Sequence, residues 1–383
     1  MTKTDEIYLS LLRDIMENGV EKDTRAGRVK SVFGRQIEFD LKEGFPLLTT
    51  KKVFTKGIIH ELLWFLQRPY NSHGSMNIEY LVKNGVHIWD DDAYRWFKNT
   101  ISSEIEPRQY MVCVNNDESN PHKADFEYWI ENDLRKGDDE WLRNVTKEEF
   151  LSLTLQRVEI WGAFGTRYRF GDLGPIYGKQ WRNFGYNGID QIQNIIDTLK
   201  ANPNDRRILC VAFNPDQLDD MALPPCHVMF QFYSRELRLS ERIAWYNMQN
   251  PNNNLPEDAS EEWVDRLGIE KRELSLSFSM RSNDWPLGAP INIESYSILC
   301  YMVAKVVNMV PGELVYHGAD VHIYTNQIDG IKEQLNRKGS DILPKLKFTP
   351  GKEFKELSDF TYDDFIIEDY YPDPIIKFPL SVG

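Results

Sequence analysis

Residues 221–232, MALPPCHVMFQF, place one of only four cysteines between a Pro-Pro pair and a histidine. A cysteine attacks carbon well only as a thiolate, and nearby cations lower the pKa of its thiol. The proline pair restricts the backbone immediately before Cys226. A buried cysteine is more often just a small apolar residue, so the Cys226-His227 pair needs support from other residues before chemistry is assigned to it.

Arginines supply part of that support. Arg206 and Arg207 stand in tandem ahead of a strand-like segment, and Arg281 lies in MRSND. Guanidinium groups match the geometry of phosphate oxygens and make bidentate hydrogen bonds to them. Three arginines around one nucleophile therefore indicate an anionic substrate and favour a phosphate group.

Four polar residues stand in apolar settings. They are Glu61 in HELLWF, Asn292 in APINIESY, and His322 and Tyr324 in DVHIYTNQI. A carboxyl group in an apolar helix must be paired or have a raised pKa, and both conditions suit proton handling. A carboxamide presents a donor and an acceptor together, which matches the N3–O4 edge of uracil. Taken singly, each is also explained as a satisfied polar group of the core.

Periodicity predicts the elements that position these residues. Apolar positions at helical spacing, ended in two cases by proline, predict helices at 5–18, 60–67, 191–203 and 295–313. Alternation predicts strands at 206–215, 227–234 and 275–282. Two polar segments, 100–160 and 235–272, resemble insertions into a single catalytic domain that spans 1–383. The second lies between two expected strands and predicts an extended hairpin.

The composition limits the function. With 45 Lys and Arg against 59 Asp and Glu, the net charge is −14, which argues against a duplex nucleic-acid binder. No apolar run is long enough to span a bilayer, and residues 1–4 begin no signal peptide. The cysteines at 113, 210, 226 and 300 show no metal-binding spacing and no disulfide framework. We expect a cytoplasmic protein with reduced thiols and no metal.

The chain resembles the thymidylate synthase family. The resemblance covers nearly the whole chain apart from the two insertions. It rests on long blocks in family order: FPLLTTKKVFTKGIIHELLWFL (45–66), GVHIWD (85–90), DLGPIYGKQWRNFG (172–185), NPNDRRILCVAFNPDQLDDMALPPCHVMFQFY (202–233), RSNDWPLGAPINIESYSILCYMVAKV (281–306) and DVHIYTNQI (320–328), continued by FTYDDFIIEDYYPDPIIKFPLSV.

This resemblance implies an α/β (α+β) fold with a mixed β-sheet, packed back to back in a homodimer with helices outside. It implies that Cys226 adds to C6 of dUMP, so that C5 attacks the one-carbon unit of the co-substrate 5,10-methylenetetrahydrofolate. Arg206 and Arg207 would act across the dimer interface, and a metal is not implied.

The family also implies roles for further residues. Asn292 would read the uracil edge, and His322 with Tyr324 would hold the ribose hydroxyl. The remaining sets are the phosphate ligands Arg25, Arg206, Arg207, Arg281 and Ser282, the proton-handling residues Glu61, Tyr177, His227, Asn214 and Asp284, and the folate-site residues Ile88, Trp89, Asp284, Leu287, Gly288 and Ile291. DTRAGRVKS departs from the family's loop, so Arg28 is an alternative to Arg25.

The family contains two outcomes from one covalent intermediate. Hydride from the folate gives thymidylate, whereas water gives a 5-hydroxymethyl nucleotide. Where the methylating members carry Phe, Gln, Ala and a terminal Val, this chain has Ile291, Met280, Glu294 and a final Gly383. Weaker enclosure of the site favours water, so we expect a deoxyuridylate hydroxymethylase of viral type. Ordinary thymidylate synthase is the alternative, and a catalytically silent nucleotide- or RNA-binding relative is a third.

Overall fold

The computed structural model describes residues 1–68, 74–103, 111–114, 144–161, 167–185 and 187–380. The chain folds into two compact units. The first unit comprises Met1–Leu62, Ile192–Val211 and Cys226–Gly383, and the second comprises Leu63–Gln191 and Ala212–Pro225. Among the described residues, no helix is long and apolar enough to cross a membrane.

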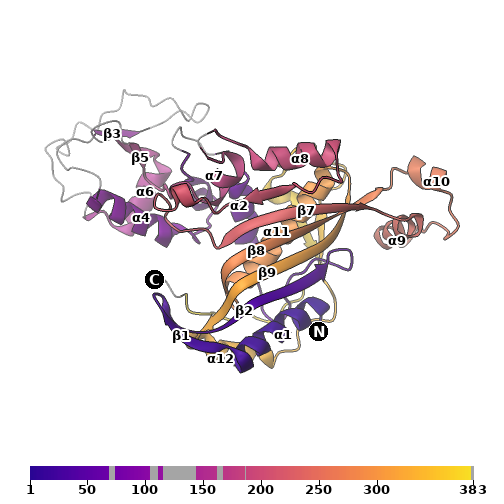
Figure 1. Cartoon of the computed structure of the whole chain (residues 1–383), viewed down its shortest axis with the longest axis horizontal. Helices are drawn as coiled ribbons and strands as arrows, with labels where there is room; N and C mark the ends of the chain where they lie inside the picture. The colour runs from indigo at the N-terminus through magenta and orange to yellow at the C-terminus, as the bar shows by residue number, and fades with distance from the viewer. Residues whose placement is uncertain (69–73, 104–110, 115–143, 162–166, 186, 381–383) are drawn as a thin grey trace. The chain divides into compact units, whose positions relative to one another are not determined.

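A six-stranded sheet is the centre of the first unit (Figure 1). Its strand order is β1-β2-β9-β8-β7-β6. Neighbouring strands are antiparallel except for the parallel pair β8–β9, so the predicted mixed sheet is confirmed. The strands are β1 (Val20–Thr24), β2 (Gly27–Asp40), β6 (Leu209–Val211), β7 (His227–Glu236), β8 (Arg272–Asp284) and β9 (Val310–Tyr324).

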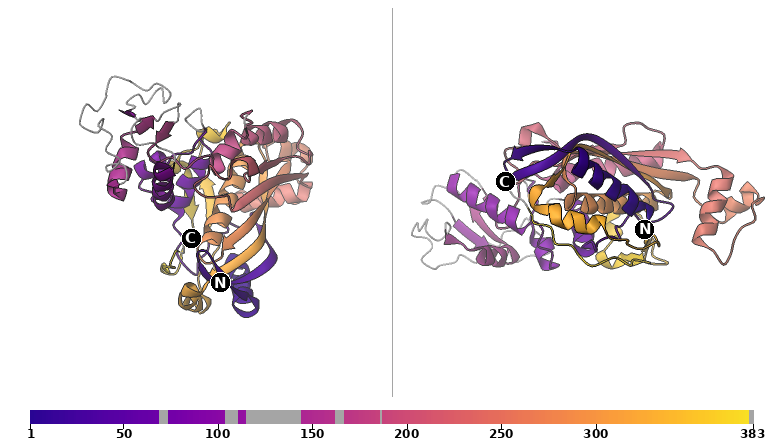
Figure 2. Two further views of the ribbon diagram at one scale, coloured as in Figure 1. Left: turned by 60° about the vertical axis from the view of Figure 1, so that its left-hand side comes forward. Right: turned by 90° about the horizontal axis from the view of Figure 1, so that it is seen from below.

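Side chains alternate between the two faces of this sheet. In β7, Phe230 and Phe232 are buried, whereas Gln231 and Tyr233 on the opposite face remain partly or largely exposed. Helices α1 (Lys3–Asn18) and α11 (Gly288–Val306) make most of the helix contacts to β2, β8 and β9. Figure 2 shows these helices along the sheet from two further sides. The core of the first unit therefore lies between the sheet and these helices.

Helix α11 differs from the predicted helix at 295–313. It begins at Gly288, with Pro290 in its first turn, where the missing N–H of proline costs no hydrogen bond. It ends at Val306, and Asn308 then adopts a left-handed conformation with φ of 55°. Pro311 belongs to β9 instead. The prediction of a helix to 313 was wrong because an apolar run reads alike in a buried helix and a buried strand.

The other predicted elements of the first unit are present with shifted ends. The helix at 5–18 is confirmed as α1, in which the Thr2 side chain accepts a hydrogen bond from the Asp5 amide. The predicted strand at 206–215 is reduced to β6, because Asn214 caps a short 3₁₀ turn at Pro215–Gln217. The remaining helices and strands here are α8 (Gln191–Ala201), α12 (Ile328–Leu335), β10 (Lys345–Phe348) and β11 (Phe365–Glu368).

Between β7 and β8 the chain forms two helices of its own. They are α9 (Leu239–Gln249) and α10 (Glu261–Arg266), and a small apolar cluster holds them together: Ile243, Leu255, Ala259, Val264 and Ile269. Strands β7 and β8 stay paired up to Glu236 opposite Arg272, directly before this segment.

The second unit is built from short elements. A three-stranded antiparallel sheet contains β3 (Met111–Val114), β4 (Val158–Trp161) and β5 (Arg167–Arg169). Its helices are α3 (Glu79–Lys83), α4 (Asp90–Ser103), α6 (Lys147–Leu155) and α7 (Tyr177–Arg182), while α2 (Thr55–Phe65) runs from the first unit into it. Much of the segment 100–160 lies outside the described residues, so its role as an insertion and the single-domain organisation stay predictions.

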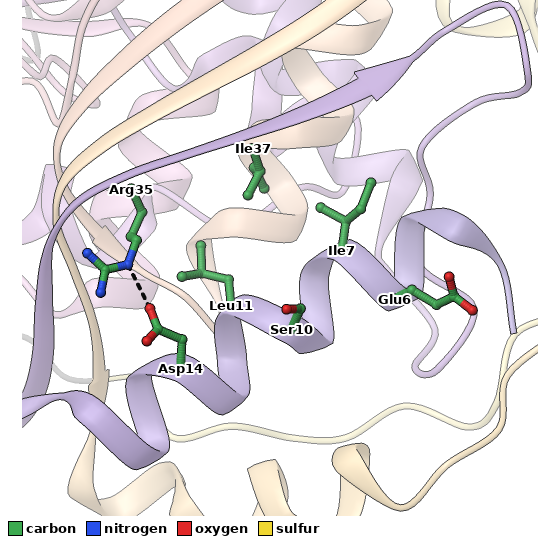
Figure 3. A pocket seen from close by; sticks show the side chains of 7 residues that line it. All are labelled: Glu6, Ile7, Ser10, Leu11, Asp14, Arg35 and Ile37. Carbon is green, nitrogen blue, oxygen red and sulfur yellow. Dashed lines mark hydrogen bonds and ion pairs between the residues drawn. The ribbon is translucent and has the colours of Figure 1, made fainter.

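A cavity of about 520 Å³ lies between α1 and β2 (Figure 3). An ion pair of 2.6 Å between Asp14 and Arg35 bridges the two elements at this cavity. Its lining consists of Glu6, Ile7, Ser10, Leu11, Asp14, Arg35 and Ile37, and includes no candidate catalytic residue.

Candidate active site

Cys226 stands directly before β7, where the chain enters the sheet. Its carbonyl oxygen accepts a hydrogen bond from the Arg281 amide at 3.0 Å, so β8 fixes the backbone that carries the thiol. Burial raises the pKa of Cys226, and the positive charge of Arg281 only partly opposes that effect. This differs from the sequence-based argument that nearby cations would lower its pKa.

His227 is held in one orientation by two contacts. Its Nε2 lies 2.9 Å from Nδ2 of Asn292, and its Nδ1 lies 3.2 Å from the Tyr296 hydroxyl. A carboxamide nitrogen can only donate, so Nε2 accepts and Nδ1 carries the proton. Burial lowers the pKa of His227 to about 4. The imidazole is consequently neutral over the physiological range.

Asn292 presents the other side of its carboxamide to the site. The side chain is 7% exposed, and among the described residues its Oδ1 has no hydrogen-bond partner. Gly288 lies next to this oxygen, because a Cβ added there would be in ordinary van der Waals contact with it at 3.5 Å. A buried acceptor is costly unless a ligand or water satisfies it. The arrangement suits a ligand that donates N–H to Oδ1 and accepts from Nδ2.

Asp284 ends β8 directly opposite His322 of β9. Its carboxylate accepts hydrogen bonds from Gln327 Nε2, at 3.0 and 3.3 Å, and from the Leu287 amide at 3.3 Å. Burial raises the pKa of Asp284, and the Gln327 hydrogen bond is the largest effect against it. Gln327 is not among the residues predicted from the sequence, although a polar side chain directly after the apolar DVHIY strand is the same kind of signal that indicated Asn292.

His322 and Tyr324 lie at the end of β9. Their ring centroids are 5.4 Å apart and the rings are nearly perpendicular, at 88°. Burial raises the pKa of Tyr324, and the charges of Asp284 and Cys226 raise it further. Ser282 pairs with Asp320 two positions earlier along the same two strands. The structure thus gathers the two hydroxyl-binding candidates beside the thiol and Asp284.

The candidate phosphate ligands come from three places in the first unit: β8, the segment before β6, and the turn between β1 and β2. Arg281 is exposed on β8, and Arg206 and Arg207 are exposed before β6. The carbonyl of Arg206 accepts a hydrogen bond from Gln231 at 3.2 Å, on the face of the sheet away from α11.

The β1–β2 hairpin bears on the choice between Arg25 and Arg28. Arg28 makes an ion pair of 2.7 Å with Glu21 across the hairpin. Arg25 stands in the exposed turn between the two strands, and in the described part of the chain no ion pair holds it. This arrangement favours Arg25 as the residue that reaches a ligand.

Four candidates belong to the second unit. Trp89 and Tyr177 are buried and their ring centroids are 6.1 Å apart. Asn214 donates to the side-chain oxygens of Gln217 and Gln180, at 3.0 and 3.3 Å. Ile88 is 41% exposed.

The remaining candidates belong to the first unit. Glu61 is 9% exposed on α2, and Ile291 is half-buried on α11. Gly288 and Ile291 belong to the first turn of α11, and Leu287 directly precedes that turn. Among the described residues, no group of three or more His, Cys, Asp or Glu is placed to hold a metal ion.

Glu294 does not take the position that the sequence suggested. It follows Asn292 by two residues on α11, and two residues of an α-helix are separated by roughly 200° around its axis. The side chain is fully buried beside the Thr55 hydroxyl, whose polar interaction with the carboxyl group opposes the effect of burial only in part. Burial raises the pKa of Glu294 to about 8. The group is a neutral acid on the far side of the helix and does not extend the site.

This buried acid predicts an unusual dependence of stability on pH. The folded protein holds the Glu294 proton up to about pH 8, whereas the unfolded chain releases it near 4.5. Stability therefore falls as pH rises between these values, because the folded state binds more protons than the unfolded state. We expect Glu294→Gln to flatten the fall in Tm over that window. Thermal melts across pH, with the exposed Glu262→Gln as control, measure the difference; parallel profiles for wild type and Glu294→Gln would contradict the assignment.

Comparison with known proteins gives a consistent result along the whole chain. A family model described as "Thymidylate synthase" matches residues 6–382. Curated relatives named thymidylate synthase include those of Mycoplasma mobile, 39% identical over 98% of this chain and 100% of the relative, and of Aster yellows witches'-broom phytoplasma, 36% identical over 98% and 99%. The protein of Mycoplasma pneumoniae is 34% identical over 98% of this chain and 99% of its own.

Proposed function

The chain belongs to the thymidylate synthase family, and we propose that it converts dUMP to dTMP, with 5,10-methylenetetrahydrofolate becoming dihydrofolate. The observation that carries the proposal is the Asn292 carboxamide beside Cys226-His227, with Nδ2 on a neutral imidazole and Oδ1 buried and unpaired. That edge complements the N3–H and O4 of uracil. A cytosine ring offers no N–H at N3 and a donor at position 4, so it fits poorly.

The sulfur of Cys226 forms the covalent bond that starts the reaction. Because the pKa of the thiol is raised, the thiol must give up its proton as sulfur bonds to C6 of the uracil. The negative charge moves onto C5 and O4, where Asn292 Nδ2 donates a hydrogen bond. 5,10-Methylenetetrahydrofolate supplies the one-carbon unit and the hydride. C5 bonds to that carbon and then loses its proton to water, while the bond between the carbon and the folate nitrogen breaks. Hydride from the departing tetrahydrofolate converts the methylene group to methyl and leaves dihydrofolate, and the Cys226–C6 bond breaks with its electron pair returning to sulfur.

The other candidate residues position ligands and move protons. Glu61, Tyr177, His227 and Asn214 would order water near the pyrimidine, and His322 with Tyr324 would bind the 3′-hydroxyl of the ribose. Arg25, Arg206, Arg207, Arg281 and Ser282 would bind the phosphate. The folate would contact Asp284, whose carboxylate is held by Gln327. It would also contact Leu287, Gly288, Ile88, Trp89 and Ile291.

Methylation is now favoured over the hydroxymethylation that the sequence analysis expected. The relatives above are named thymidylate synthase, and they come from Mycoplasma and phytoplasma bacteria, which gives no support to a viral source. Glu294, one of the departures used to favour water, is a buried neutral acid away from Asn292. Gly383 lies outside the described residues. Ile291 and Met280 are the departures that still favour a 5-hydroxymethyl product.

The folate product separates the candidates. With dUMP and methylenetetrahydrofolate, the proposal expects one dihydrofolate per nucleotide converted, followed by ultraviolet absorbance, and a nucleotide with the mass of dTMP. If the products were tetrahydrofolate and 5-hydroxymethyl-dUMP, the proposed methylation would be wrong and the protein would be a deoxyuridylate hydroxymethylase. Absence of any turnover by folded protein, with dUMP binding retained, would indicate a catalytically silent relative.

Arg281 gives a test of the phosphate site. Arg281→Ala is expected to raise KM for dUMP at least about tenfold, because a charge-assisted hydrogen bond to phosphate is lost. Arg266, an exposed residue of α10 that pairs with Glu262, provides the control, and Arg266→Ala is expected to leave KM unchanged. Steady-state kinetics at fixed folate measures both variants. Equal effects at the two positions would count against the site.

We infer a homodimer formed through the second face of the sheet. Along that face Gln231, Ser277 and Val315 are neighbours on three adjacent strands and are all half-buried, and Tyr233 is 65% exposed. Gln231 also holds the Arg206 carbonyl, which would direct Arg206 and Arg207 toward the partner's site. Sedimentation that finds only monomers at catalytic concentrations would contradict the arrangement.

A further inference from the structure

Asp320 links three strands of the sheet. It lies on β9, two residues before His322, and its Oδ1 is 3.2 Å from Nδ1 of that histidine. The same oxygen accepts a hydrogen bond from the Ser31 hydroxyl of β2 at 2.7 Å, and Oδ2 forms an ion pair with Lys22 of β1. None of Asp320, Ser31 and Lys22 is among the site residues predicted from the sequence.

These contacts keep Asp320 ionised. Partial burial raises its pKa, but the hydrogen bonds from Lys22 and Ser31 outweigh burial and the net pKa lies below the usual value. An ionised carboxylate can only accept hydrogen bonds. The proton between Asp320 and His322 therefore resides on Nδ1, which leaves Nε2 as the ring nitrogen that faces a ligand and, in the tautomer with a single ring proton, as a hydrogen-bond acceptor.

Lys22 connects the same carboxylate to the hairpin that carries Arg25. In register, Lys22 faces Val29, which in turn faces Tyr324 of β9. Lys22 lies on the edge strand β1, three residues before Arg25 in the turn. Its ion pair with Asp320 of β9 therefore spans β2, which lies between these two strands. Strand β1 pairs only with β2 within the described sheet, so this contact adds a second attachment for the hairpin.

We propose that Asp320 is a positioning residue that fixes His322 as a hydrogen-bond acceptor for the 3′-hydroxyl of the deoxyribose, with Lys22 holding Asp320 in place. The inference rests on the proposed function, which puts a deoxyribonucleotide at His322 and Tyr324. It goes beyond that function in assigning the tautomer of His322 and the residues that determine it. Asp320 acts through His322 and does not itself contact the ligand.

The test compares two ligands that differ by one hydroxyl, dUMP and 2′,3′-dideoxyuridine 5′-monophosphate. Dissociation constants are measured for wild type, Asp320→Asn, His322→Ala and the double variant. Wild type is expected to prefer dUMP by about tenfold, the size of one well-placed hydrogen bond. Asp320→Asn, which keeps the shape but loses the charge and one acceptor oxygen, is expected to reduce the preference to about twofold. Adding Asp320→Asn to His322→Ala is expected to change the preference no further.

Lys22→Met extends the same comparison. It is expected to reduce the preference for dUMP by about twofold, since the ion pair is partly exposed and screened. Lys3, whose surface pair with Glu43 lies on α1 and the segment after β2, provides the matched control, and Lys3→Met should leave the preference unchanged.

The outcomes distinguish the inference from the function on which it rests. Equal weakening of both ligands by Asp320→Asn would show that Asp320 acts only on overall structure, and the proposal would be wrong while dTMP synthesis stands. A wild type that makes dTMP but does not distinguish the two ligands would overturn the role of His322 and of Asp320 with it. A wild type that neither binds dUMP nor turns it over would overturn both proposals.

Discussion

Cys226→Ala is expected to lower kcat by about 10⁴-fold or more, because the proposed reaction has no route that avoids the covalent bond to C6. Binding of dUMP is expected to persist, since the phosphate, ribose and uracil contacts come from other residues. Steady-state turnover and isothermal titration with dUMP measure the two effects separately. Cys226→Ser is expected to be nearly as inactive, because a hydroxyl is a much weaker nucleophile at neutral pH.

Cys300 supplies the control for this experiment. Its thiol is buried and lies 3.3 Å from the Leu274 carbonyl, and Cys300→Ala is expected to retain turnover. Mass spectrometry of wild type with 5-fluoro-dUMP and the folate is expected to show an adduct that Cys226→Ala lacks. Turnover by Cys226→Ala, or an adduct on a different cysteine, would remove the basis of the proposed mechanism.

Asn292→Asp is expected to lower kcat/KM for dUMP by about 10³-fold, in line with the loss of one hydrogen-bond donor to an oxygen that becomes negative during the reaction. The change replaces the Nδ2 donor with a carboxylate oxygen facing O4, and it removes the hydrogen bond to Nε2 of His227. A carboxylate accepts the 4-amino group of cytosine, so dCMP is expected to bind the variant better than dUMP does. Competition binding and turnover with both nucleotides measure the change.

Asn336→Asp provides a surface comparison, because Asn336 only donates to the Lys332 carbonyl at the end of α12. Its kcat/KM is expected to match wild type. If Asn292→Asp kept its selectivity for dUMP, the uracil edge would have to be read by other residues.

Much of the fold followed from periodicity and turn chemistry. The strand that follows Cys226 and the strand that carries Arg281 alternate clearly, and they are present as β7 and β8. The limits of α11 could not be predicted, because its apolar run continues beyond the helix into β9 and the reversal at Asn308 depends on a left-handed residue. Local propensity does not distinguish these cases.

The candidate site, like the fold, could be predicted only in part from the sequence. Residue types indicated Cys226, Asn292 and His322, because each is a reactive or polar group in an apolar stretch. Gln327 meets Asp284 of β8 from the turn that follows β9, and Asp320 is held by Ser31 of β2 and Lys22 of β1. These contacts join segments far apart in the sequence, so only the folded structure shows them. The direction of the Cys226 pKa shift depends on burial, which a sequence does not reveal.

The helices between β7 and β8 have a consequence for how this protein tolerates change. The residues of their apolar cluster all come from this segment. The last paired residues of β7 and β8, Glu236 opposite Arg272, come directly before it. The register of β7 with β8 is therefore fixed by the residue pairs between His227 and Glu236. We therefore expect that changes within residues 237–271 leave the pairing between β8 and the end of β7 next to Cys226 intact.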